Sequence, residues 1–174
     1  MTAILTAFAV VGFAWAPQGG HQPNMSAGAV AHMKDVSFMR GHWHGKQVFN
    51  TGGAPLSGDV HSEVVPAVGG RYLRETLNVT MPGGRNSDTL HMLTWDAASK
   101  EYKAWWFNDT STDPTEFSGE LKGGTLSMSA KTGGGIELRV TYHKVSQSEF
   151  TYQLEMHQGA KWQQLFKTDY VRER

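Results

Sequence analysis

From residue 41 onward, apolar and polar residues alternate in short runs, the pattern of β-strands with one face in a core. In residues 125–131, Leu126, Met128 and Ala130 alternate with two serines and a lysine. Residues 149–157 alternate in the same way, with four large apolar side chains on one face. The pattern therefore predicts a β-rich domain.

Turn residues separate these runs at regular intervals. Nine breaks interrupt the chain, at 52–53, 69–70, 82–84, 96–98, 112–114, 123–124, 133–135, 146–148 and 158–159. Intervals of about 8 to 12 residues between turns are typical of hairpins that close into a barrel or sandwich. We therefore predict an all-β fold, a single antiparallel barrel of about ten strands, preceded by one short amphipathic helix within residues 29–40.

The N-terminal segment has the features of an export signal. Residues 3–16 are apolar and end in Ala14-Trp15-Ala16, a small-x-small pattern that signal peptidases accept. We expect a signal peptide over residues 1–16, a disordered linker over 17–28, and the barrel over 29–174. The protein would then be periplasmic or secreted, without stable membrane insertion after export. An uncleaved anchor is the alternative, because no Lys or Arg precedes the apolar run and Pro17 would follow the cut.

Composition removes several classes of function. Lys+Arg and Asp+Glu both number 16, so the 174-residue chain has no net charge and no basic field for nucleic acid. Cysteine is absent, which excludes disulfides, thiolate metal sites and a cysteine nucleophile. The sequence indicates no cofactor and does not determine the oligomeric state.

Strand parity places polar residues among the inward-facing ones. Glu75 shares a face with Leu77, and in the last run the even positions of 162–172 share a face that includes Gln164. An unpaired buried polar group costs about 1 to 3 kcal/mol, so a hydrated or ligand-filled interior is predicted, unless these residues face solvent instead. The candidate ligand-binding residues are Trp43, Glu75, Leu77, His91, Tyr102, Trp106, Asn108, Tyr152, Gln164 and Tyr170.

Four segments resemble a known family. They are GHWHG (41–45), GGRYLRE (69–75), residues 92–109 and DYVR (169–172). Together they are similar to a bacterial family of small exported proteins, a domain of unknown function grouped with lipocalin-like (calycin) barrels. Thr94-Trp95 stands where that family usually has Gly-Tyr. The resemblance implies a small closed barrel with a ligand cavity and no established reaction.

The histidines of GHWHG have two interpretations. In lipocalin-like barrels a Gly-x-Trp marks the first strand, with the Trp closing one end and an Arg from a late strand covering it. Trp43 and Arg172 match this pattern. If Trp43 points inward, His42 and His44 point outward together, and with His61 they are the candidate ligands of an exported zinc-binding protein.

These observations predict a binding protein for a small hydrophobic or amphipathic molecule. The chain carries no catalytic signature, so we expect binding rather than catalysis. The alternative from another class is an enzyme that uses Glu75 and His91 as an acid/base pair in the same cavity, if the two side chains meet across the barrel.

Overall fold

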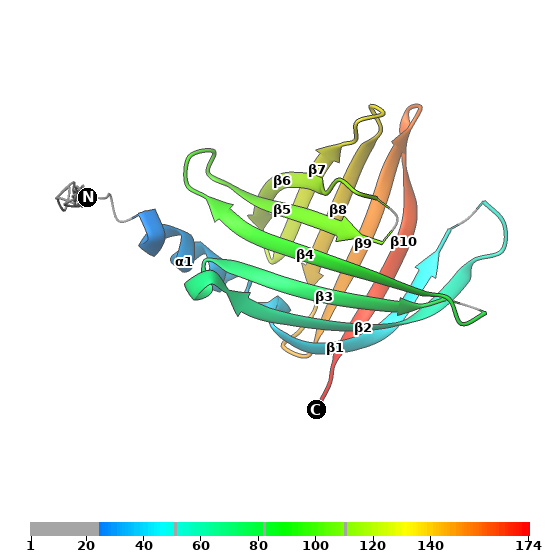
Figure 1. Ribbon diagram of the computed structural model, residues 1–174, viewed down its shortest axis with the longest axis horizontal. Coiled ribbons are helices and arrows are strands. Elements are labelled where there is room, and N and C mark those ends of the chain that lie inside the picture. Colours follow the sequence, from blue (N-terminus) through cyan, green and yellow to red (C-terminus); the bar gives the residue numbers. More distant parts are fainter. Residues whose placement is uncertain (1–24, 51, 82, 110) are drawn as a thin grey trace, which may run out of the picture.

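The computed structural model describes residues 25–50, 52–81, 83–109 and 111–174 (Figure 1). Its strands confirm the predicted fold: ten antiparallel strands follow one another around a closed barrel, and β1 pairs with β10 to close it. They are β1 Gly41–Phe49, β2 Leu56–Ala67, β3 Tyr72–Thr80, β4 Asn86–Asp96, β5 Glu101–Asn108, β6 Thr115–Lys122, β7 Thr125–Lys131, β8 Glu137–Lys144, β9 Glu149–Gln158 and β10 Lys161–Arg172.

Helical structure precedes the barrel. Helix α1 spans Met25–Asp35, a 3₁₀ turn η1 spans Ser37–Met39, and a second turn, η2, spans Val68–Gly70 between β2 and β3. Helix α1 therefore begins inside the segment 17–28 that we expected to be a linker. The sequence pattern missed this start because the small residues there carry little amphipathic signal. The expected signal peptide lies outside the described residues. None of the helices in the described ranges has the length and apolar character needed to span a membrane.

One end of the barrel, the closed end, is covered by η1 and the last turn of α1. Trp43 is fully buried there, and its Nε1–H donates to the Met39 carbonyl at 2.7 Å. The Arg172 guanidinium lies 4.1 Å from the Trp43 ring and donates to the Arg40 carbonyl at 2.6 Å. The predicted Trp plug and its Arg cover are confirmed. Gly41 is required beside them, because a Cβ at φ +130° would lie 2.2 Å from Arg172 Nη1.

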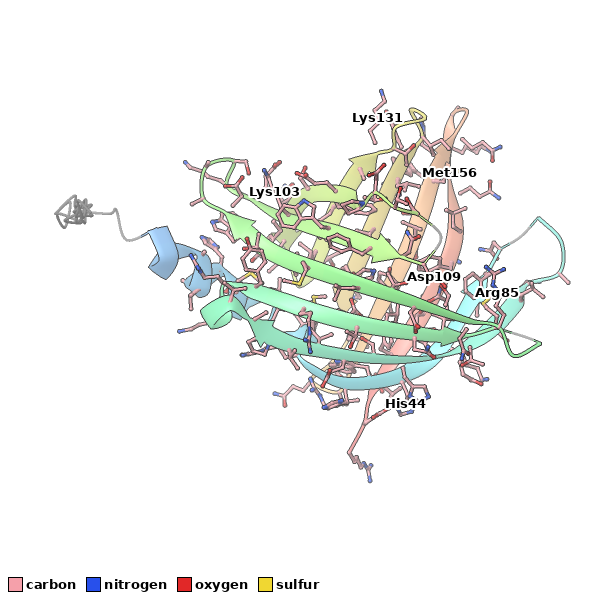
Figure 2. The ribbon with its side chains drawn as sticks, in the orientation of Figure 1. His44, Arg85, Lys103, Asp109, Lys131 and Met156 are labelled. Atoms are coloured by element: carbon pink, nitrogen blue, oxygen red, sulfur yellow. The ribbon has the colours of Figure 1, made fainter. Side chains whose placement is uncertain are left out.

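The histidines beside Trp43 point away from the interior, as the alternation predicts. His44 lies opposite His61 in the β1–β2 register, on the outer wall of the barrel (Figure 2). His61 Nδ1 instead lies 3.2 Å from a carboxylate oxygen of Glu173. Within the described ranges no group of three or more His, Asp or Glu side chains is placed to hold a metal ion, so the zinc alternative gains no support.

The register of β10 changes partway along the strand. Gln164 lies opposite Glu155, but the next paired residue is Phe166, opposite Leu154, so Leu165 is an extra residue in a β-bulge. Glu155 belongs to the outer wall, where it accepts from the Arg139 guanidinium at 2.7 Å. The prediction that the even positions 162–172 share one face was therefore wrong: the bulge puts Gln164 on the outside.

Candidate functional site

A cavity of about 490 Å³ opens at the end of the barrel opposite α1. Figure 2 shows Arg85 at this open end, in the turn between β3 and β4. Apolar side chains form much of the wall, and the cavity is lined by Gln47, Phe49, Leu77, Val79, Met81, Arg85, Ser87, Thr89, His91, Trp106, Asn108, Tyr152, Leu154 and Phe166.

A carboxylate and an imidazole meet at the floor of this cavity. Glu75 and His91 are directly opposite in the β3–β4 register, and Oε2 of Glu75 lies 2.9 Å from Nδ1 of His91. Ser62 donates its hydroxyl to the other oxygen, Oε1, at 2.7 Å. Both oxygens of Glu75 thus have partners, which stabilises a carboxylate that is only 4% exposed. The expectation that Glu75 and His91 meet is confirmed, although they meet on adjacent strands rather than across the barrel.

Aromatic rings surround this pair. The His91 ring stacks on the Trp106 ring, with centroids 4.3 Å apart and 17° between the planes. Burial raises the pKa values of Tyr142, Tyr152 and Tyr170 well above 10, and the negative charge of Glu75 raises them further. The three hydroxyls therefore stay protonated at neutral pH.

Some polar atoms of the interior have no partner. Among the described residues, the buried side-chain atoms without a hydrogen bond are His91 Nε2, Trp106 Nε1 and Tyr170 Oη. Ser62 is close enough to Tyr170 to oppose part of the rise in its pKa. For His91 and Trp106 no such neighbour exists in the described part of the chain. Most buried polar groups in proteins are hydrogen-bonded, so these two nitrogens need an explanation.

The structure brings only part of the predicted site together. The candidates that line the cavity are Leu77, His91, Trp106, Asn108 and Tyr152. Glu75 lies behind His91, beside a nearly filled space of about 10 Å³.

Four candidates lie elsewhere. Trp43 and Tyr102 face inward but belong to the closed end, where the Tyr102 hydroxyl donates to the His32 carbonyl of α1 at 2.9 Å. Tyr170 is packed against Phe150, with ring centroids 4.7 Å apart. Gln164 is on the outer wall because of the bulge in β10. Alternation along a strand gives the face of a residue but not its height in the barrel, which explains why the first three face inward without lining this cavity.

Sequence reasoning also missed residues of the cavity wall. Gln47 and Phe49 share the parity of Trp43, so the first strand already contained the signal for both. Gln47 is 4% exposed and accepts from the Thr168 hydroxyl at 3.2 Å. Arg85 lies in a turn, where no periodic pattern indicates the direction of a side chain.

A second hollow, of about 720 Å³, lies mainly on the outer wall over β1 to β5. Much of its lining consists of outward-facing residues such as His42, Glu63 and Phe107, the last 42% exposed. Solvent reaches the side chains of His42 and Glu63, which are 64% and 40% exposed, so these two groups need no ligand to satisfy their hydrogen bonds. The inner cavity is the better candidate because its floor contains buried polar atoms without partners.

Comparison with known proteins identifies the family. Residues 29–172 match the model of a family described as "Protein of unknown function (DUF1579)". The chain belongs to the DUF1579 family. The match extends over the whole barrel and over α1 from its fifth residue, as expected from the resemblance of the sequence segments. A comparison with curated proteins found no match.

Solved structures resemble this barrel at low sequence identity. Rv2717c from M. tuberculosis is 13% identical with a TM-score of 0.60, over 82% of this chain and 97% of that chain. The S-type phycobiliprotein lyase CPES from Guillardia theta is 8% identical with a TM-score of 0.58, over 84% of this chain and 93% of that chain. Likeness at this identity shows a common fold.

Proposed function

We propose that the protein binds a small, partly apolar molecule in the cavity at the open end of the barrel. One observation carries the proposal: a largely apolar cavity of about 490 Å³ is lined by His91 and Trp106, and each of these rings carries a buried nitrogen without a hydrogen-bond partner. Ligand sites in proteins are typically concave, largely apolar and roughly 300 to 1,000 Å³ in volume, with a few placed polar groups. One structural neighbour is named a phycobiliprotein lyase, so a barrel of this shape occurs in a protein that acts on another molecule.

A matched pair of substitutions tests where the ligand binds. Val79 lines the inner cavity and not the outer hollow, whereas Leu90 points outward and lines only the outer hollow. An apolar fluorescent dye should bind the unmodified protein saturably, with one site per barrel. Val79→Trp should weaken this binding at least about tenfold by filling the cavity, since a loss of 1.4 kcal/mol is tenfold in affinity. Leu90→Trp should leave it unchanged.

The outcomes of this experiment separate the two sites. Loss of dye binding in Leu90→Trp alone would place the ligand in the outer hollow. If the dye does not bind and native mass spectrometry finds no retained molecule, the barrel is a packed structural domain without a ligand site. Circular dichroism of both variants checks that each retains the β-sheet spectrum of the parent.

A second candidate function is an enzyme that acts in the same cavity. The contact between Glu75 and His91 favours it, because a carboxylate that holds one ring nitrogen orients the imidazole for acid/base work. The test is mass spectrometry of a bound molecule before and after incubation with the protein and with a His91→Gln variant. Conversion that depends on His91 would establish the enzyme, and recovery of the molecule unchanged from both would remove it for that compound.

A further inference from the structure

The two partnerless nitrogens belong to one stacked pair at the cavity floor. His91 and Trp106 face each other across the β4–β5 register, and both rings line the cavity. His91 is 3% exposed and Trp106 is 8% exposed, so bulk water does not satisfy either nitrogen. What these two atoms need from a ligand follows from their hydrogen-bonding roles.

Glu75 determines the role of the His91 nitrogen. A carboxylate only accepts hydrogen bonds, so the Nδ1 atom 2.9 Å from Glu75 carries the ring hydrogen and donates it. In the neutral imidazole the other nitrogen, Nε2, is then left as an acceptor. The Tyr142 hydroxyl is 3.5 Å from the same Nδ1, too far to compete strongly with the carboxylate.

Trp106 supplies the opposite role. The indole Nε1–H is a donor and never an acceptor. With His91 neutral, the floor therefore presents one acceptor, His91 Nε2, and one donor, Trp106 Nε1–H, whereas a protonated His91 would present two donors. An alkyl chain leaves both unpaired, an ether oxygen can accept from Trp106 only, and a carboxylate brings a second negative charge towards Glu75.

We propose that the cavity selects ligands that carry a hydroxyl group on an apolar body, with the hydroxyl at the edge of the two stacked rings, donating to His91 Nε2 and accepting from Trp106 Nε1–H. A hydroxyl donates one hydrogen bond and accepts another, so it satisfies both nitrogens at once. It also reproduces the bonds that a water molecule would make, while its apolar body covers the cavity wall. The proposal rests on the proposed function and names the ligand class for that same site.

Two isomers test this selectivity. 1-Octanol and heptyl methyl ether contain the same atoms, but only the alcohol can donate a hydrogen bond. Each is titrated against the protein loaded with the apolar dye, and displacement gives its affinity. The alcohol should bind about 2- to 12-fold more tightly than the ether, the range expected for one net hydrogen bond. Octanoate should bind more weakly than 1-octanol.

A shape-conserving substitution then tests the role of Glu75. In Glu75→Gln, Ser62 still donates to the carbonyl oxygen, and the amide NH₂ takes the position facing His91 Nδ1. The amide donates, so the ring hydrogen moves to Nε2 and the acceptor becomes a donor. The preference for the alcohol should fall to about onefold. Glu63→Gln makes the same change on the outer wall and should preserve the preference.

Trp106→Phe provides a second, independent variant. It removes the donor that both isomers use, so both should lose affinity while the ratio between them persists. Thermal unfolding followed by circular dichroism checks the fold of each variant. Equal affinities of the two isomers for the unmodified protein, or a preference that survives Glu75→Gln, would overturn the selectivity while dye binding still upheld the proposed function. If neither the dye nor either isomer binds, the proposed function itself fails.

Discussion

Removal of the Trp43 side chain should destabilise the barrel more than any change to the histidines beside it. Trp43 is 1% exposed, packs edge-on against Phe150 with centroids 4.7 Å apart, and donates to the Met39 carbonyl at 2.7 Å. Trp43→Ala therefore deletes a buried indole, a hydrogen bond and the ring under Arg172. Deletion of a buried large aromatic side chain typically costs about 3 to 5 kcal/mol, and we expect a value within that range.

The assay is urea unfolding followed by far-UV circular dichroism, with His42→Ala and His44→Ala as controls. Both histidines lie on the same strand but point outward, so each substitution should change the free energy of unfolding by less than about 0.5 kcal/mol. The loss of unfolding free energy for Trp43→Phe should lie between that of Trp43→Ala and those of the two histidine variants, because phenylalanine keeps most of the packing but loses the hydrogen bond to Met39. Near-equal losses for the alanine variants at 42, 43 and 44 would refute the reasoning.

Three further predictions concern titration and processing. The pKa of Asp96 is lowered to about 2, mainly by the hydrogen bond from Lys103. The contribution of Asp96 to stability should therefore be present above pH 4 and be lost as the pH falls towards 2. Asp96→Asn should remove that part of the acid-unfolding profile. Burial raises the pKa values of three tyrosines, so ultraviolet titration should show their ionisation only when alkali unfolds the barrel, and stability should decline as the pH rises above 10. If the N-terminal segment is a cleaved export signal, mass spectrometry of the exported protein should find Pro17 as its first residue, and a full-length mass would indicate an anchor.

Alternation along the sequence predicted the fold and much of the inward face. In β1, β7 and β9 the pairing with a neighbouring strand runs without a register shift, so the alternation of inward and outward side chains holds over each strand. It fails at Gln164, because a bulge inserts one residue and nothing in the local sequence distinguishes Leu165 from a paired position. A bulge depends on the neighbouring strand, which a single-strand pattern does not include.

The location of the cavity is a different problem. Trp43, Tyr102 and His91 all face inward, but only His91 reaches the open end. Which end is closed depends on where α1 and η1 fold back, and that is decided by contacts such as Met33 and Met39 against the barrel core. Long-range packing of this kind leaves no mark within one strand. The acid/base pair could be proposed because Glu75 and His91 are visible in the sequence as residue types. The β3–β4 register that places them opposite each other could not be predicted from either strand alone.

The pairing of β1 with β10 has a consequence for the biogenesis of the chain. The barrel closes only when residues 41–49 meet residues 161–172, the first and last strands, and Arg172 then bonds back to Arg40 beside the first strand. At a synthesis rate of roughly 5 to 20 residues per second, the edge of β1 waits on the order of ten seconds for its partner. During that time it presents unpaired backbone groups that favour pairing with other chains. The nascent protein should therefore depend on a holding chaperone until its last strand has emerged.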